Sequence, residues 1–243
     1  MTPENNNVEP EKNFDPNVMT KAGQGYFHRN STIGALLMHV HSQIALHKPE
    51  PFNWMGQHES LLVSIVFCRL VDNFSMYLTE LFLEVGNSNP LIFLSIDAPV
   101  SVGEILKIGG EAAVQNLLEK KIAGLSYKSF EDQRKELKNR LNFELLSDTE
   151  ALDVTELIAI RNLFVHNNGV VNSVFLEKCP WRKEALGDKI FVDFKWMMGA
   201  HERLFKYIFQ IDYQAVKKWK LDSYTLVDAI KEFHNATSNQ RDQ

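Results

Sequence analysis

The chain has 243 residues, of which 44% are hydrophobic and 23% charged, a composition typical of one elaborated globular domain, with two small domains as the other option. Its net charge of −5 argues against a protein that coats nucleic acid, which would need a broad basic face, but it leaves room for a small basic cleft. Two cysteines, Cys68 and Cys179, make no disulfide framework and favour a reducing, cytoplasmic compartment.

The first twenty residues are predicted to be a disordered tail, because positions 1–17 are polar and contain three prolines. The next segment, Ser31–Leu46, has helical character and carries His39 and His41, with His47 just beyond it. On a helix His39 and His41 point to nearly opposite sides, so we expect no metal site there. We therefore expect residues 21–234 to form the single folded domain.

A long core helix is predicted from about Met55 or His58 to Val85, because its apolar residues keep helical spacing and Gly86 supplies a stop. Its longest apolar run, Leu61–Val71, is interrupted by polar residues and is too short to span a bilayer, so no membrane partner is expected. Asp72 lies three residues after Arg69 on this helix, so a local ion pair with Arg69 is one alternative for Asp72. The other alternative is a partner from a different helix.

The middle of the chain is predicted to hold a short strand or apolar connector at 91–96 and a helix at 111–123. A second helix at 129–141 is strongly charged. Its basic residues are interleaved with acids, which favours a solvated face over an RNA-binding one. After the motif helix described below, we expect an amphipathic helix at 195–211, a short helix at 224–234, and a frayed tail at 235–243.

The most informative segment is a helix bounded by recognisable start and stop signals. Ser147 and Glu150 have the spacing of a capping box, and Asn167-Asn168-Gly169 is a plausible end. The apolar residues between them cover most of the circumference, which predicts a helix buried nearly all round. Arg161 and His166 interrupt this apolar segment and need a physical reason, because burying an unpaired charge is costly.

A guanidinium and an imidazole together supply the chemistry for cleaving a phosphodiester without a metal, since one holds negative charge and the other carries protons. Arg161 and His166 lie roughly 140° apart on a helix, so Arg161 must use its length to reach His166. Asn162 shares a face with His166 and is expected to orient the imidazole. The structural alternative is that His166 caps the helix and Arg161 pairs with a buried carboxylate.

The run Arg161-Asn162-Leu-Phe-Val-His166-Asn167 resembles the signature of the HEPN superfamily, the higher eukaryotes and prokaryotes nucleotide-binding domains. The resemblance spans roughly residues 55–235 and implies an all-α fold, a HEPN-like helical bundle with additional peripheral helices. Catalytic members are metal-independent endoribonucleases that act as dimers with a composite cleft, and many are toxins or antiphage effectors. Other members are non-catalytic modules that bind RNA, a nucleotide or a protein.

The resemblance implies a catalytic set of Arg161, His166, Asn162, Asn167 and Asp72, in which Asp72 is the candidate carboxylate facing Arg161. It also implies an RNA substrate, a homodimer, and a possible antitoxin or regulatory protein as partner. The chain has no phosphate loop, dinucleotide-binding glycine pattern or paired Cys-x-x-Cys motif, so no cofactor and no metal are expected.

Overall fold

The computed structural model describes residues 15, 18–46, 59–95, 99 and 101–239. Within these residues the chain forms α-helices, one short 3-10 helix and two isolated β-bridges, so the predicted all-α fold class is confirmed. The elements in chain order are α1 (Lys21–Leu46), α3 (Glu59–Ser88), η1 (Pro90–Ile92), α4 (Val102–Ile108), α5 (Gly110–Ser126), α6 (Phe130–Leu141), α7 (Asp148–Asn167), α8 (Ser173–Lys178), α9 (Phe194–Trp219) and α10 (Leu226–Asn239).

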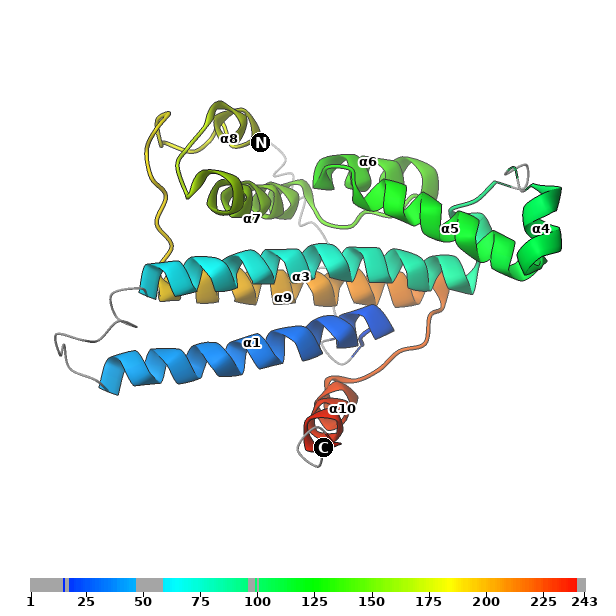
Figure 1. Ribbon diagram of the computed structural model, residues 1–243, viewed down its shortest axis with the longest axis horizontal. Coiled ribbons are helices and arrows are strands. Elements are labelled where there is room, and N and C mark those ends of the chain that lie inside the picture. Colours follow the sequence, from blue (N-terminus) through cyan, green and yellow to red (C-terminus); the bar gives the residue numbers. More distant parts are fainter. Residues whose placement is uncertain (1–14, 16–17, 47–58, 96–98, 100, 240–243) are drawn as a thin grey trace, which may run out of the picture.

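Helix α3 lies at the centre of the bundle and packs against α1, α5, α7 and α9. The three longest helices, α1, α3 and α9, run along the long axis of the molecule (Figure 1). Helices α5, α6, α7 and α8 cover the opposite side of α3 from α1, while α4 stands at one end and α10 lies below α1 (Figure 1). This arrangement places α7, which carries the predicted motif, directly on the central helix.

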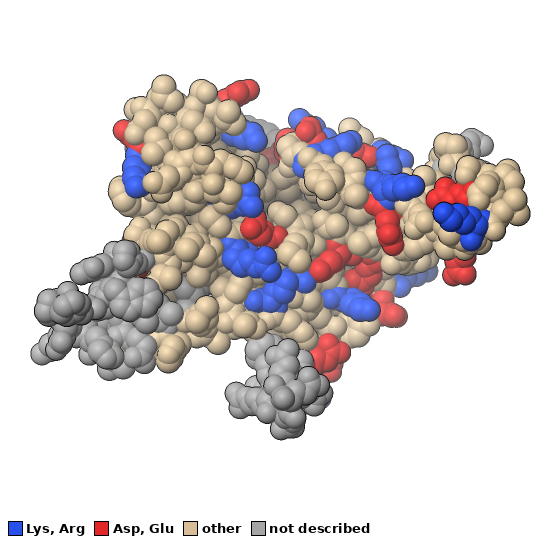
Figure 2. All heavy atoms as spheres, in the orientation of Figure 1, with Lys and Arg blue, Asp and Glu red and all other residues tan. Residues whose placement is uncertain are grey.

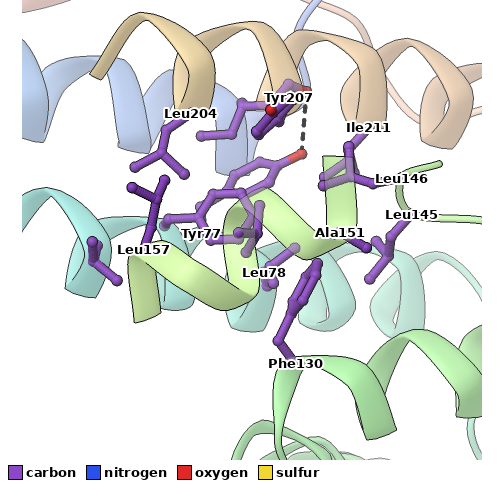
Figure 3. Close-up of a cluster of buried hydrophobic side chains, with 14 of the residues drawn as sticks. Tyr77, Leu78, Phe130, Leu145, Leu146, Ala151, Leu157, Leu204, Tyr207 and Ile211 are labelled. Carbon is purple, nitrogen blue, oxygen red and sulfur yellow. Dashed lines mark hydrogen bonds between the residues drawn. The ribbon is translucent and has the colours of Figure 1, made fainter. Parts of the chain in front are cut away.

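Aromatic and aliphatic side chains from α3, α6, α7 and α9 fill the core between these helices. Tyr77 on α3 is fully buried and lies among Leu157 and Leu204, with its hydroxyl directed toward α9 (Figure 3). Phe130 of α6 closes the other side of the cluster (Figure 3). Burying a side chain of this size stabilises the fold by roughly 1.5–3 kcal/mol, so this cluster fixes α7 against α3 and α9.

The first helix begins ten residues earlier than predicted, at Lys21 rather than Ser31. Its free backbone N–H groups meet carboxylates from distant helices: Asp212 of α9 accepts from the Thr20 N–H at 3.0 Å, and Glu84 of α3 accepts from the N–H groups of Lys21 and Ala22. Such long-range capping leaves no signal near the helix start, which explains the late predicted boundary.

The predicted tails differ from the structure where it describes them. Met19 and Thr20 are buried, and Met19 pairs with Tyr224, so the packed region starts before residue 21. Helix α10 continues through residues 235–239, which were predicted to be frayed. Residues 1–14 and 16–17, His47, the predicted helix start at 55–58, and 240–243 lie outside the described residues, as does the side chain of His41.

Two other predicted elements are corrected. The segment predicted as a strand or connector at 91–96 begins instead as the 3-10 helix η1, which Asn89 caps through its side chain. Helix α9 continues to Trp219, past the predicted end at Ile211. Helix α3 extends well beyond the apolar run Leu61–Val71, and by length and composition alone it could cross a membrane, but half of its most apolar window is buried, as in the core helix of a bundle.

Candidate functional site

Helix α7 begins as the sequence predicts. The Ser147 hydroxyl accepts a hydrogen bond from the Glu150 N–H, and the Glu150 carboxylate accepts one from the Ser147 N–H, which completes the capping box. At the other end Asn168 and Gly169 both take left-handed backbone conformations, with φ values of 51° and 76°. Local signals therefore set both ends of the helix that carries the motif.

The burial of α7 differs from the prediction that it is covered all round. Its inner face is buried on α3 and α9, but Leu152 and Val165 are about half exposed, at 50% and 49%. Arg161, Asn162 and His166 lie on or beside this outer face, Arg161 and Asn162 half-buried and His166 exposed. The motif therefore lies at the surface of the bundle, and its polar groups have access to solvent and to a partner.

Arg161 is held by two neighbours. Its Nη2 forms an ion pair with the Asp72 carboxylate of α3, 2.7 Å from Oδ1, and its Nη1 donates a hydrogen bond to the Asn162 side-chain oxygen at 3.0 Å. The side chains of Arg161 and Asp72 are 26% and 36% exposed, so the pair is neither fully buried nor fully solvated. The structure thus brings Asp72 to Arg161, as the resemblance implies, rather than to its sequence neighbour Arg69.

His166 does not join this cluster. No hydrogen bond connects His166 with Arg161 or Asn162 in the part of the chain that the structure describes, and the imidazole is exposed at the last turn of α7. The expected direct contact of Arg161 with His166 is therefore not formed, and the guanidinium is paired with Asp72 of α3 instead. Asn162 uses its oxygen to hold Arg161, so it does not orient the imidazole as expected.

Asn167 serves the end of the helix in this structure. Its side-chain N–H group donates to the Val170 carbonyl oxygen, and its own carbonyl accepts from the Val170 N–H. These bonds close the turn after α7, which is the structural role that the short sequence Asn167-Asn168-Gly169 predicts. Of the five predicted site residues, the structure brings three together, Arg161, Asn162 and Asp72, and leaves His166 and Asn167 apart from them.

Cys68 is a neighbour of the cluster that the sequence did not indicate. Its thiol lies 3.9 Å from the Arg161 carbonyl oxygen and is half-buried between α3 and α7. Burial raises the pKa of the Cys68 thiol to about 11, although the Arg161 charge acts in the opposite direction. The only feature of the sequence that could have indicated this contact is the position of Cys68 four residues before Asp72, which places both on one face of the helix.

A groove opens beside the Arg161 cluster, between α3, the α5–α6 connection and α7. It has a volume of about 680 Å³, and Asn162 forms part of its wall. Its floor is apolar, with Phe74, Leu78 and Phe130, and its rim carries Lys128 and Lys178 with several hydroxyl groups. This size and mixture of surfaces are those of a small-ligand site.

The charged residues near the groove are mostly paired. The basic residues of α6 bind acids, as in Arg134 with Asp148 and Arg140 with Glu136, which favours the predicted solvated face. Lysine and arginine are interspersed with acids over the face shown in Figure 2, without a continuous basic field. Among the described residues, no three His, Cys, Asp or Glu side chains gather to hold a metal ion.

No protein-family model, curated protein or solved structure matches this chain.

Proposed function

We propose that the protein is a metal-independent endoribonuclease that acts as a homodimer in the cytoplasm, with a HEPN-like composite site built on Arg161 and His166. The observation that carries the proposal is the partial exposure of an Arg161 guanidinium that Asp72 and Asn162 hold in place, five residues before an exposed His166. A fixed cation and a free imidazole at one surface are the two groups that the reaction needs.

In the proposed reaction each group has one task. Arg161 Nη1 donates to Asn162, Nη2 is paired with Asp72, and Nε is buried without a partner, so the nonbridging oxygens of a phosphodiester bind the remaining N–H groups of Nη1 and Nη2. His166 takes the proton of the ribose 2′-hydroxyl, whose oxygen attacks phosphorus, or gives a proton to the departing 5′-oxygen. The products then carry a 2′,3′-cyclic phosphate and a 5′-hydroxyl.

The homodimer follows from the need for an acid and a base when each chain has one histidine in the motif. Both helices of the site carry exposed apolar side chains suited to an interface: Val165 beside His166 on α7, and Leu61 and Ile65 on α3, which are 57% and 56% exposed. Leu61, Ile65 and Asp72 fall on one stripe of α3. An interface that covers the side chains of Leu61 and Ile65 therefore also brings a partner close to Asp72 and Arg161.

The test combines an RNA-cleavage assay with a measurement of the protein's molecular mass in solution. Purified protein at micromolar concentration is expected to run as a dimer by light scattering and to cleave single-stranded RNA in excess EDTA. A monomer that cleaves at full rate contradicts the two-histidine mechanism. Activity that EDTA abolishes and a divalent ion restores contradicts the assignment of Arg161 and His166 as the chemical groups.

A second candidate is a non-catalytic helical module that binds RNA, a nucleotide or a protein such as an antitoxin. The observation that favours it is the ion pair of Arg161 with Asp72 and its hydrogen bond to Asn162 within one chain, which give the motif a structural task at the contact of α3 and α7. This candidate predicts RNA or protein binding without cleavage in the same assay.

A further inference from the structure

The groove beside Asn162 continues the surface on which His166 lies. Thr155, Ile158 and Asn162 line it at spacings of three and four residues along α7. His166 is the next residue in that series, four positions after Asn162, so it lies on the same face of the helix at the open end of the stripe. A chain bound at His166 can therefore extend directly into the groove.

The lining of the groove suits one unpaired nucleotide. Phe74, Leu78 and Phe130 give it an apolar floor, on which a base loses little by leaving water. Tyr127 lies at its rim with a side chain that is 92% exposed, an unusual position for a large aromatic ring. Stacking a base on such a ring is independent of sequence, because every base has a π-face.

Two polar groups in the groove have hydrogen-bonding capacity to spare. The Asn162 oxygen accepts from Arg161, while its amide N–H donors bind no other described residue. Gln133 is 92% buried at the α6 side, where its Nε2 donates to the backbone carbonyls of Ser126 and Lys128 and its Oε1 has no protein partner. An amide donor and an amide acceptor are what the edge of a base can pair with.

The charge of the rim is consistent with a phosphate. Lys178, at the end of α8, forms no ion pair with any acid in the described part of the chain, whereas Lys128 is paired with Glu136 and Glu131 with Arg134. An unpaired lysine at the mouth of an apolar groove places one positive charge where the backbone of a bound strand would enter.

From these observations we infer that the groove between α3, α6 and α7 is a subsite for an unpaired nucleotide of an RNA strand, next to the phosphodiester at His166. The base stacks at Tyr127 over the apolar floor, and its phosphate meets Lys178. The identification of the strand as the substrate rests on the proposed ribonuclease function, but binding in the groove does not.

The test uses a fluorescein-labelled 2′-O-methyl RNA octamer of mixed sequence, which cannot be cleaved because its 2′-oxygen is blocked. Fluorescence anisotropy at low salt gives its Kd for the full chain. Tyr127→Ala and Lys178→Glu should each weaken binding about tenfold. Both side chains are exposed, so neither change is expected to disturb the fold. The matched controls are Phe191→Ala, another exposed aromatic, and Lys183→Glu, another exposed lysine near α8; both should bind as wild type.

The outcomes separate the subsite from the proposed function. Unchanged binding by Tyr127→Ala and Lys178→Glu, or no binding of the octamer by the wild type, overturns the subsite. If adenosine monophosphate competes with the labelled octamer as effectively as an unlabelled octamer does, the ligand of the groove is a free nucleotide. That result overturns the assignment of an RNA strand as the ligand. Groove-dependent binding without cleavage of unmodified RNA overturns the ribonuclease and keeps the subsite. Cleavage of RNA with an unchanged KM in Tyr127→Ala and Lys178→Glu keeps the ribonuclease and overturns the subsite.

Discussion

Asp72 of α3 forms an ion pair with the Arg161 guanidinium of α7, with 2.7 Å between Oδ1 and Nη2, although 89 positions separate the two residues in the sequence. The ion pair joins the central helix to the helix that carries the motif, and among the described residues the guanidinium makes no hydrogen bond to His166. The pair lies at a partly exposed surface, so it retains some contact with water. Its two tasks, to hold the helices and to present a cation, predict separate effects on stability and activity.

Arg161→Ala should lower the free energy of unfolding by about 1–2 kcal/mol, because it leaves the half-buried Asp72 carboxylate without its charged partner. A fully buried pair would cost more, roughly 3–5 kcal/mol, but this pair is partly solvated. Arg69→Ala is the matched control, since Arg69 is exposed on the same helix as Asp72. Chemical denaturation of both variants measures the difference, and superimposable curves would show that the pair contributes nothing.

Gly23→Ala should destabilise the protein by about 2 kcal/mol or more, because a Cβ at that position would overlap the Asp212 carboxylate. Gly34→Ala on the same helix is the matched control: a Cβ there meets no atom within 4 Å. It should raise stability by roughly 0.5–1 kcal/mol, as alanine favours a helix over glycine. Thermal unfolding should show a lower unfolding temperature for Gly23→Ala and a higher one for Gly34→Ala, each relative to wild type. A change in the same direction for both variants would contradict the close approach of α1 to α9.

The buried Asp212 predicts a pH-dependent stability. Burial raises the pKa of Asp212 to about 7, although hydrogen bonds from Thr20 and Tyr77 favour its charged form. The folded protein therefore binds this proton more tightly than the unfolded chain does. The contribution of Asp212 to stability is greatest near pH 4, falls as the pH rises toward 7, and is level above that value.

Asp212→Asn should remove this dependence. Urea denaturation at pH 5, 6 and 7 should show a fall in the wild-type free energy of unfolding, by up to about 1.4 kcal/mol per pH unit, that is smaller in the variant. Glu177→Gln, which changes an exposed carboxylate on α8, should keep the wild-type slope. If all three proteins show parallel pH profiles, Asp212 does not titrate in this range.

Both cysteines should react slowly with iodoacetamide at pH 7.5 in the folded protein. Burial raises the pKa of Cys68 and of Cys179 to about 11, so few molecules hold the reactive thiolate. Mass spectrometry should show little modification in native buffer and full modification in guanidinium chloride. Rapid modification of native Cys68 would mean that the contact between α3 and α7 opens at this point.

The sequence predicted the parts of this fold that depend on local signals. The capping box at Ser147 and Glu150 and the stop at Asn168 and Gly169 bound α7 correctly, because each uses residues within one turn of the helix end. The start of α1 was missed because Asp212 and Glu84, which satisfy its N–H groups, come from other helices. Gly23 and Gly25 also lower the local helix propensity there.

The candidate site divides in the same way. The resemblance named Asp72, Arg161 and Asn162, which the structure places together. The angle between Arg161 and His166 on a single helix, however, led us to expect that Arg161 reaches toward His166. That angle contains no information on the neighbouring helix α3, which supplies Asp72. Cys68 and the groove residues of α6 lie near the motif only through tertiary packing, and no spacing in the chain indicates them.

The most direct test of the proposed ribonuclease is the rate at which His166→Ala cleaves single-stranded RNA in EDTA, compared with wild type and with His39→Ala, which removes another exposed histidine. We predict that wild type and His39→Ala leave 2′,3′-cyclic phosphate ends at equal rates, and that His166→Ala is slower by about a hundredfold or more with an unchanged unfolding temperature. Equal rates for all three proteins, or no cleavage by the wild type, would contradict a catalytic Arg161–His166 motif.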